Sequence, residues 1–498
     1  MTCKHGHVNR SKYLVGLGLV ILATLLIFSV LPLGTAFEFG DDESYEVIKA
    51  FMCSKGYRLY TEIWNDQPPV STVLLTAAFK ISGPSILTAR LVAAGFGLVL
   101  IAAFHELVQQ RSGQWAALLA SFFLLASPGV LLLSVSVMLE VPAIGTGLVS
   151  AWLLFQWSRH WHCGWLLASA VLMGVALQIK LTAALVAPAM MVELWLMCRA
   201  DRNRSWRKGI VISTLLWGVA VITIFVAIGL TWGRGSLMSS WKSHTATQVV
   251  AGYGRAADYG FEPRLLLNHL ECVFAAVVCL LTAAWRRRLR EIAFPLALLV
   301  TASVIHAVHR PWWNYYYLHL AVPLAWLTGW ILALLVQHLF DSWPGKLPGP
   351  ASAGIWKALA LCVLAALPVA RSERRLEGSA KHLRRQESAA GNPVVKKMKE
   401  HAARTKWVYS ESGIYPFHAH LIVLPELAII MPKRFWSGQI STRKIVETCK
   451  RYQPEMIMLP RASATEEWKE LLGRHYVVEA TDKACVLYLA KRLRDGAL

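Results

Sequence analysis

Three consecutive acids follow the first long apolar run of the sequence: Asp41, Asp42 and Glu43. A carboxylate at a membrane surface can accept a proton from an attacking hydroxyl, or it can hold a cation that screens a phosphate. Acids in the first turn of a helix also stabilise the helix dipole, and the residues after Asp41 have a helical pattern. These acids are therefore candidate catalytic groups, with a helix N-terminus as the alternative interpretation.

Two further ionisable residues are set singly within long apolar stretches. Glu140 is the only acid between positions 106 and 193, and Lys180 is the only Lys or Arg between positions 159 and 199. A charge in apolar sequence is costly to place in a membrane, so it marks a functional candidate. The alternatives are a solvated helix end for Glu140 and, for Lys180, a side chain that extends to the membrane interface.

A basic and aromatic segment later in the chain could bind an anion. His309 and Arg310 precede a run of Trp and Tyr residues that includes Tyr315 and Tyr316. An arginine can hold a phosphate through charge-assisted hydrogen bonds. Rows of Trp and Tyr also anchor helices at membrane interfaces, and this alternative stays open.

The composition excludes an ordinary soluble enzyme. Of the 498 residues, 55% are hydrophobic and only 16% are charged, which is typical of a membrane protein. On a soluble protein the net charge of +21 would suggest a nucleic-acid partner, but much of this charge lies in short segments between apolar runs. Positive charge in such segments orients helices during membrane insertion, so we expect no nucleic-acid partner. The sequence also lacks a P-loop, and its nine cysteines form no zinc-binding pattern.

The elements that must position these residues are membrane-spanning helices. A helix of roughly 20 apolar residues crosses the hydrocarbon core, and about eleven runs approach this length. They lie at 13–34, 86–108, 115–137, 142–157, 165–179, 181–198, 210–231, 265–284, 292–308, 315–337 and 354–370. Lys and Arg cluster in alternate loops, which predicts a multi-pass protein of the cell membrane with a cytoplasmic N-terminus.

The tail of the chain has a different pattern. Short strand-like runs alternate there with amphipathic helical segments, which predicts a small α/β domain. The strand-like runs are Trp407–Ser410, Leu421–Leu424, Met456–Leu459, Tyr476–Val478 and Cys485–Leu489. An odd number of crossings places this tail outside the cytoplasm. We therefore expect a mainly α fold, with a transmembrane domain over residues 1–370 and a C-terminal extracytoplasmic domain over residues 371–498.

The first outside loop, residues 35–85, is expected to contain interfacial helices. The run from Val70 to Ile81 is too short to span the membrane, and Pro68 and Pro69 give it a rigid start. The predicted topology also brings Asp42 to the face that holds Glu140, Lys180 and Arg310, although the four residues come from distant segments. Carboxylates and cations at one leaflet suit a donor in which a sugar is linked to a lipid phosphate.

The order of motifs in this first loop resembles that of a known superfamily. The motifs are Asp42-Glu43 with Tyr45, then Gly56-Tyr57, Trp64-Asn65-Asp66-Gln67-Pro68-Pro69, Gly83-Pro84-Ser85 and Ala89-Arg90-Leu91. They are similar to the first loop and second helix of the GT-C glycosyltransferases, above all the protein O-mannosyltransferases and the bacterial aminoarabinose and lipopolysaccharide sugar transferases. The resemblance covers roughly residues 13–340.

The resemblance implies roles for individual residues. Asp42 corresponds to the first-loop acid that acts as base, while the extra acid Asp41 leaves the assignment between the two open. Glu140 takes the place of a second-loop Asp, and Lys180 corresponds to a lysine that binds phosphate. By the same resemblance His309 or Arg310 approaches the donor phosphate, Tyr315 and Tyr316 the lipid, and Asp66 belongs to the substrate-binding loop.

The function expected from these observations is sugar transfer. A polyprenyl-phosphate sugar would be the donor, and a hydroxyl group of a lipid, glycan or protein would be the acceptor, at the extracytoplasmic face of the membrane. A divalent cation is left open as a cofactor. The alternative is a polytopic transporter or flippase for a lipid-linked or anionic substrate, although the sequence shows neither related halves nor broken helices.

Overall fold

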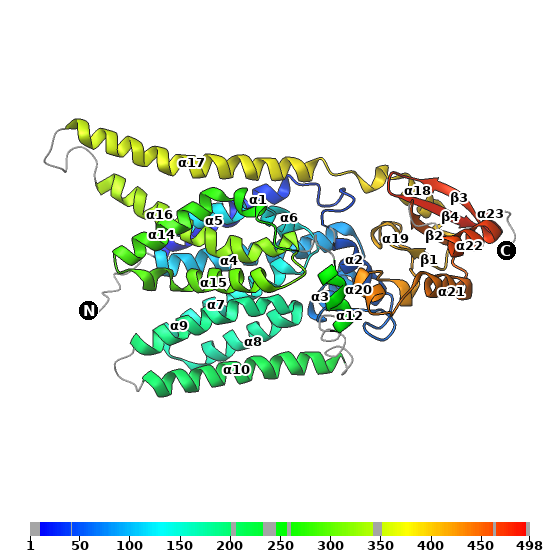
Figure 1. Cartoon of the computed structure of the whole chain (residues 1–498), viewed down its shortest axis with the longest axis horizontal. Helices are drawn as coiled ribbons and strands as arrows, with labels where there is room; N and C mark the ends of the chain where they lie inside the picture. Colours follow the sequence, from blue (N-terminus) through cyan, green and yellow to red (C-terminus); the bar gives the residue numbers. More distant parts are fainter. Residues whose placement is uncertain are drawn as a thin grey trace.

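The computed structural model describes residues 10–40, 42–200, 206–232, 246–255, 260–341, 351–461 and 465–494. The catalytic candidate Asp41 lies outside the described residues. A bundle of long helices forms one part of the molecule, and a smaller α/β part lies at one end of it (Figure 1). The mainly helical fold with a small C-terminal sheet agrees with the sequence prediction.

The first helices of the bundle come before and after the first loop along the sequence. They are α1 (Arg10–Ser29), α4 (Ile86–Ser112), α5 (Gln114–Leu125) and α6 (Val130–Val135). The predicted span 115–137 is interrupted between α5 and α6, where Gly129 adopts a left-handed conformation with φ of 74°. Glycine adopts this conformation at little steric cost, so it ends one helix and redirects the chain into the next.

The middle of the bundle holds two of the candidate residues. Its helices are α7 (Glu140–His160), α8 (Cys163–Ile179), the 3-10 helix η1 (Leu181–Val186), α9 (Ala187–Ala200) and α10 (Trp206–Thr231). Glu140 is the first residue of α7, and Lys180 is the single residue between α8 and η1, with an extended backbone. Because α7 and α8 form a helical hairpin, the start of α7 and the end of α8 lie at the same end of the bundle (Figure 1).

The remaining helices complete the bundle and lead to the C-terminal part. They are α12 (Thr247–Arg255), α13 (Arg264–Leu267), α14 (Leu270–Trp285), η3 (Leu289–Ile292), α15 (Ala293–Val308), η4 (Asn314–Tyr317), α16 (Leu318–Asp341) and α17 (Ala351–Arg384). The long helix α17 runs along one side of the bundle toward the α/β part (Figure 1). The predicted domain boundary between residues 370 and 371 falls inside this helix.

Five helices among the described residues are long and apolar enough to cross a membrane. They are Ile86–Ser112, Leu181–Ala200, Lys208–Thr231, Leu289–Val308 and Asn314–His338. Each predicted span contains a helix, but several of these helices are shorter than a full crossing, so the count of about eleven is not confirmed. α10 exposes the large apolar side chains Val211, Ile212 and Leu215 on its outer face, as a lipid-facing helix does.

The first loop folds onto the end of the bundle as two short helices, α2 (Glu43–Ser54) and α3 (Val70–Ser82). Pro69 stands at the N-cap position of α3, which agrees with the rigid start predicted for this helix. One face of α2 is buried through Val47, Ile48 and Phe51. This burial fixes the orientation of α2 and therefore of the acids at its N-terminus.

The C-terminal part contains a four-stranded sheet in the order β1-β2-β4-β3. Its strands are β1 (Val408–Ser410), β2 (Met456–Pro460), β3 (Tyr476–Thr481) and β4 (Cys485–Ala490), with β1 and β2 parallel and the other pairs antiparallel. The short helices beside it are η5 (Ala389–Gly391), α18 (Pro393–Glu400), η6 (Ala402–Arg404), α19 (Ile414–His418), η7 (Pro425–Leu427), α20 (Pro432–Trp436), α21 (Thr442–Tyr452), α22 (Glu466–His475) and α23 (Lys491–Arg494).

One strand prediction is wrong. The run Leu421–Leu424 forms only an isolated bridge, between Val423 and Val408 of β1. Pro425 follows it directly and begins the 3-10 helix η7, so the chain turns away before a ladder can extend.

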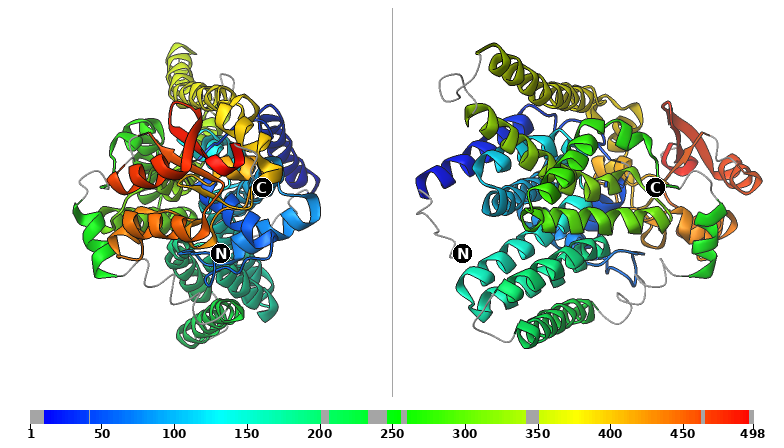
Figure 2. Two further views of the ribbon diagram at one scale, coloured as in Figure 1. Left: turned by 90° about the vertical axis from the view of Figure 1, so that its right-hand side faces the viewer. Right: turned by 60° about the vertical axis from the view of Figure 1, so that its left-hand side comes forward.

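The first loop and the C-terminal part share one hydrophobic core. Ile48 and Phe51 of α2 pack with Phe417 of α19, and the rings of Phe51 and Phe417 lie 5.8 Å apart in an edge-on arrangement. Two further views confirm that the sheet and its helices lie beyond the loop end of the bundle (Figure 2). The C-terminal part therefore contributes directly to the environment of α2.

Candidate active site

Asp42 occupies the N-cap position of α2, but its side chain makes no capping hydrogen bond. The hydroxyl of Tyr315, which comes from η4, lies near the carboxylate and acts to lower the pKa of Asp42. Glu46, one turn further along α2, lies close enough for its charge to act on Asp42. The acids therefore do lie at a helix N-terminus, as the alternative interpretation expected, but the side chain of Asp42 does not cap the helix.

The surroundings of Asp42 make its carboxyl group a weaker acid than usual. The pKa of Asp42 is raised to about 6, mainly because the carboxyl group is buried and also because of the nearby charges of Glu140 and Glu46. The charge of Lys180 and the Tyr315 hydroxyl act in the opposite direction. A base is most effective when its pKa lies near the working pH, so this shift suits proton abstraction.

Glu140 and Lys180 form a buried ion pair. Both side chains are almost fully enclosed, with exposed fractions of 1% for Glu140 and 9% for Lys180. The pair joins the start of α7 to the end of α8, which the helical hairpin brings together. The prediction from loop charges that these two residues share one face of the membrane therefore corresponds to direct contact.

Two tyrosines of η4 pack on the same lysine. The ammonium group of Lys180 lies 4.8 Å from the ring centre of Tyr315 and 5.5 Å from that of Tyr316. These distances are typical of cation–π contacts. The ammonium group of Lys180 therefore contacts two aromatic rings as well as the Glu140 carboxylate. Asp42, Glu140, Lys180, Tyr315 and Tyr316 thus converge from four segments of the chain.

Glu43 forms a buried ion pair with Arg90. Its carboxylate accepts two hydrogen bonds from Arg90 of α4, with Nε–Oε1 and Nη2–Oε2 distances of 3.0 and 2.7 Å. It also accepts bonds from the backbone N–H groups of Phe39 and Val137. Glu43 and Arg90 are completely buried. With both of its oxygens hydrogen-bonded, Glu43 connects the loop beside Asp42 to α4, which favours a positioning role, while its assignment as a catalytic acid stays a prediction.

Replacing Glu43 by Ala should cost about 3–5 kcal/mol of the free energy of unfolding, because the Arg90 guanidinium is left buried without its partner. Thermal or denaturant unfolding of the purified protein in detergent measures this loss. Glu377→Gln is the matched control, since Glu377 forms an exposed ion pair with Lys381 within α17 and should contribute nothing measurable. Equal stability of the two variants would contradict the positioning role.

The remaining predicted residues lie elsewhere. His309 and Arg310 are exposed and make none of the described contacts with Asp42, Glu140 or Lys180. Asp66 forms a buried ion pair with Lys433 of α20, which connects the first loop to the C-terminal part. The structure therefore brings Glu140 and Lys180 to Asp42 but does not bring Arg310 into contact with them.

Sequence reasoning missed the residues that support the loop. Lys49 donates hydrogen bonds to Glu46 (2.7 Å) and to Asn65 (3.0 Å), and Asn65 in turn donates to the carbonyl of Gln67. This buried network connects α2 to the segment that leads into α3. The spacing of Glu46 and Lys49 by three residues in a helix was the signal that could have indicated the first of these contacts.

A cluster of metal-binding residue types lies away from Asp42. Within the described ranges, His269, Glu271 and Cys272 bring their ligand atoms within 4.8 Å of one another. His269 already bonds to Tyr317 (2.9 Å), and Glu271 forms ion pairs with Arg371 and Arg375 of α17. Because His269 and Glu271 already have these partners, the cluster connects α14 to η4 and α17. A divalent cation beside Asp42 remains a prediction.

Part of the chain is similar in sequence to a known protein family, and the whole fold is similar to solved structures. The sequence model of the dolichyl-phosphate-mannose-protein mannosyltransferase family matches residues 66–232. ArnT from Cupriavidus metallidurans bound to undecaprenyl phosphate has a similar structure, with a TM-score of 0.63, 16% sequence identity and coverage of 96% of this chain and 98% of that one. No curated protein matches the sequence.

A second solved structure has the same fold. The oligosaccharyltransferase AglB from Archaeoglobus fulgidus, in complex with an inhibitory peptide and a dolichol-phosphate, matches with a TM-score of 0.52 and 14% identity over 90% of this chain and 70% of that one. Identities this low support the fold alone. Over residues 66–232 this chain is therefore similar to the dolichyl-phosphate-mannose-protein mannosyltransferases, and its overall fold is similar to the folds of ArnT and AglB.

Proposed function

We propose that this protein transfers a sugar from a polyprenyl-phosphate donor to a hydroxyl group of a lipid, glycan or protein acceptor at the extracytoplasmic face of the membrane. The observation that carries this proposal is the convergence of a carboxylate of raised pKa, Asp42, with the Lys180–Glu140 pair and two tyrosines. The fold shared with structures that contain undecaprenyl phosphate or dolichol-phosphate supports a donor of this class.

The proposed reaction is a single displacement at the anomeric carbon. Asp42 accepts the proton of the acceptor hydroxyl, and the hydroxyl oxygen forms a bond to the anomeric carbon. The bond from that carbon to the phosphate oxygen breaks, and its electron pair leaves with the polyprenyl phosphate. Negative charge therefore grows on the phosphate, where the Lys180 ammonium stabilises it. One displacement inverts the configuration of the sugar.

The placement of this site outside the cytoplasm rests on the sequence. Lys and Arg, such as Arg199 at the end of α9 and Lys208 at the start of α10, cluster at the other end of the bundle, and cation-rich ends stay in the cytoplasm. The first loop and the C-terminal part lie together at the opposite end (Figure 1). Both would then face the extracytoplasmic side, with the N-terminus in the cytoplasm of a multi-pass cell-membrane protein.

An assay with several donors tests the proposed activity. Purified protein is incubated with a panel of polyprenyl-phosphate sugars, and release of polyprenyl phosphate is measured together with labelling of a hydroxyl acceptor. At least one donor should release its lipid phosphate only when active protein is present. Movement of an intact lipid-linked sugar across vesicles, without any release of polyprenyl phosphate, would instead support the transporter alternative.

The rate of transfer should depend on pH through Asp42. Because the base must be unprotonated, the rate should rise with pH, reach half of its maximum near pH 6 and stay level above it. At pH 5 it should be about tenfold below the plateau. Initial rates at saturating acceptor measure this profile. Glu46→Gln should move the midpoint to lower pH, since the Glu46 charge raises the pKa of Asp42; an unchanged midpoint would contradict the assignment.

A further inference from the structure

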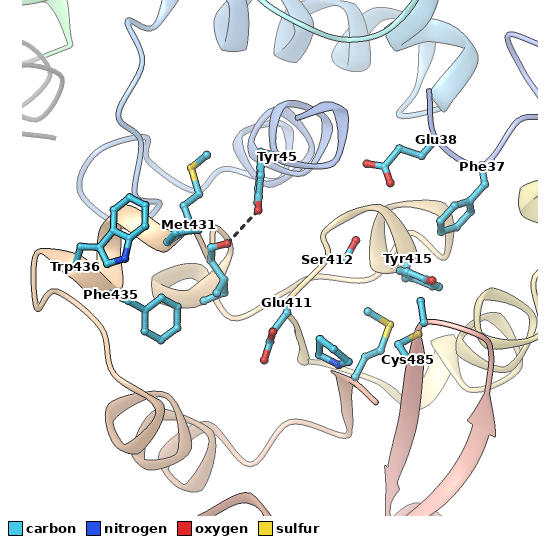
Figure 3. A pocket seen from close by; sticks show the side chains of 15 residues that line it. Phe37, Glu38, Tyr45, Glu411, Ser412, Tyr415, Met431, Phe435, Trp436 and Cys485 are labelled. Atoms are coloured by element: carbon cyan, nitrogen blue, oxygen red, sulfur yellow. Dashed lines mark hydrogen bonds between the residues drawn. The ribbon is translucent and has the colours of Figure 1, made fainter. Parts of the chain in front are cut away.

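A cavity of about 690 Å³ lies between the first loop and the C-terminal part (Figure 3). Tyr45, Glu411 and Tyr415 are among the residues that line it. Because Tyr45 follows Asp42 by three residues on α2, this cavity adjoins the candidate active site. The basic surface of α17 lies on a separate element, and the proposed displacement does not use it.

One side of α17 carries a row of exposed side chains that changes from apolar to basic along the helix. Val363 and Leu367 are 50% and 63% exposed. Arg374, Lys381 and Arg385 follow them and are exposed as well. The spacings of four, seven, seven and four residues place all five on one side of a helix with 3.6 residues per turn. These five residues are called the α17 stripe below.

The helical geometry extends to the last residue of the α17 stripe. Arg385 directly follows Arg384, the final residue of α17. The backbone N–H of Arg385 still donates a hydrogen bond to the carbonyl of Lys381, four residues earlier, as in a helix. Arg385 therefore lies on the same side of α17 as Arg374, from which it is separated by about 16 Å along the helix axis.

The positive charge of the α17 stripe is not cancelled by the acids of the same helix. Within the described ranges, the side chains of Arg374 and Arg385 form no hydrogen bond or ion pair. Lys381 pairs with Glu377 at 2.7 Å, but both side chains are exposed, so the contact is weak. The other acid of α17, Glu373, lies about 100° around the helix axis from Arg374. Two cations of the stripe are therefore available to an outside partner.

The charged half of α17 contacts the ends of two bundle helices. Arg375 donates a hydrogen bond to the carbonyl of Ala126, which follows α5, and Arg384 donates one to the carbonyl of Val30, which follows α1. In the proposed topology both of these helix ends face the extracytoplasmic side. Leu367 precedes Arg375 by eight residues, or about 12 Å along the helix. The stripe therefore runs from the hydrocarbon core to the extracytoplasmic surface of the membrane.

The order of side chains in the α17 stripe matches the order of groups in a phospholipid. Its apolar residues lie at the depth of the acyl chains, and its first arginine lies where the phosphate groups begin. A guanidinium group binds a phosphate through two parallel hydrogen bonds. Basic residues that directly follow a transmembrane helix also attract anionic lipids electrostatically. The stripe thus offers complementary contacts to both parts of an anionic lipid.

Resting on the topology of the proposed function, we propose that the α17 stripe binds an anionic phospholipid of the extracytoplasmic leaflet. The lipid phosphate contacts Arg374, and an acyl chain lies along Leu367 and Val363. Lys381 and Arg385 are farther from the membrane and add to the positive potential around the headgroup. Phosphatidylcholine has the same phosphate, but its trimethylammonium group cancels the charge. The stripe therefore selects phosphatidylglycerol over phosphatidylcholine.

A photoreactive side chain at position 378 identifies the lipid that lies on the stripe. Gly378 is exposed, and a side chain added there meets no atom within 4 Å. Its position lies between Arg374 and Lys381 on the same side of α17. Benzoylphenylalanine replaces Gly378 in the full-length protein, and in a control protein it replaces Val219, which is 61% exposed on α10. The segment 209–232 around this control position contains no charged residue.

Both proteins are placed in nanodiscs that contain equal amounts of phosphatidylglycerol and phosphatidylcholine. After illumination at low salt, mass spectrometry gives the ratio of the two crosslinked lipids. The ratio at position 378 should exceed the ratio at position 219 by about fivefold, which is the effect of one cation near a membrane surface. It should fall toward the control value in 1 M salt, where charges are screened beyond about 3 Å. Equal ratios at the two positions at low salt would overturn the proposal.

Arg374→Gln assigns the selectivity to the stripe. This variant should bring the ratio at position 378 close to the control value, while Arg385→Gln should lower the ratio less, because Arg385 is farther from the membrane. Lys450→Gln is the matched control, since Lys450 is an exposed cation of α21 in the C-terminal part, and it should leave the ratio unchanged. A ratio that Arg374→Gln does not lower would overturn the proposal.

The donor assay separates failure of this inference from failure of the proposed function. Crosslinking requires no sugar donor, so its result does not depend on transfer. Selectivity for phosphatidylglycerol at position 378, without release of polyprenyl phosphate from any donor, would retain the lipid site and remove the transferase. Release from a donor combined with equal ratios at the two positions would retain the transferase and remove the lipid site.

Discussion

Asp42→Asn should lower the rate of sugar transfer by a factor of about 100 to 10,000, which is the range that general-base catalysis contributes. Asparagine has the same shape as aspartate and fits beside the Tyr315 hydroxyl, so the loop should keep its structure. Binding of the donor lipid should stay near the wild-type value, because the change removes only the proton acceptor. Single-turnover transfer and a separate donor-binding measurement distinguish these two effects.

Asp41→Asn is the matched control for this experiment. The two acids are adjacent in the sequence, and the resemblance to the GT-C enzymes leaves the choice between them open. A dead Asp41→Asn variant together with normal turnover in Asp42→Asn would move the base to Asp41. Normal turnover in both variants would contradict the displacement mechanism as a whole.

Lys180→Gln should both destabilise the protein and slow the transfer. The substitution leaves the Glu140 carboxylate buried without its partner, which costs about 3–5 kcal/mol of the free energy of unfolding. It also removes the cation that we propose stabilises the leaving phosphate, so transfer should slow by roughly tenfold or more. Unfolding in detergent and single-turnover kinetics measure the two effects separately.

The double variant Lys180→Gln, Glu140→Gln separates catalysis from folding. Removing both charges should restore most of the stability, because no buried carboxylate is left unpaired, but transfer should remain slow. Recovery of transfer together with stability would show that Lys180 serves only to neutralise Glu140. Arg310→Gln and Arg264→Gln are comparison variants, because each removes a single positive charge elsewhere in the chain. If Arg310 contacts the donor phosphate, Arg310→Gln should slow transfer and Arg264→Gln should not.

The transmembrane helices could be predicted because their signal is local. Runs such as 86–108 and 210–231 are apolar over the length of a membrane crossing, and α4 and α10 occupy these positions. The shared location of Glu140 and Lys180 could also be inferred, because alternating loops assign each helix end to one side. The break after α5 depends on the conformation of a single glycine, Gly129, and the hydropathy pattern did not reveal it.

The long-range contacts of the site could not be read from the sequence. Glu43 and Arg90 are 47 residues apart in the sequence. Three adjacent acids do not indicate which one of them forms an ion pair with an arginine of another helix. Arg310 comes directly after the C-terminal end of α15, which is where the sequence placed it. The position of a residue along the chain does not determine the direction in which its side chain points. The cavity between the first loop and the C-terminal part could not be predicted from the sequence either, because it forms only when these two parts pack together.

The shared core of the first loop and the C-terminal part has a consequence for biosynthesis. Ile48 and Phe51 are made early, but they pack with Phe417, Met456 and Leu487, and the last of these lies in the final strand of the sheet. During translation the helices can insert one after another, while the packing of α2 against the C-terminal part can form only after the end of the chain has emerged and folded. We therefore expect α2, and with it the acids at its start, to be held in place only after the last strand of the sheet has formed.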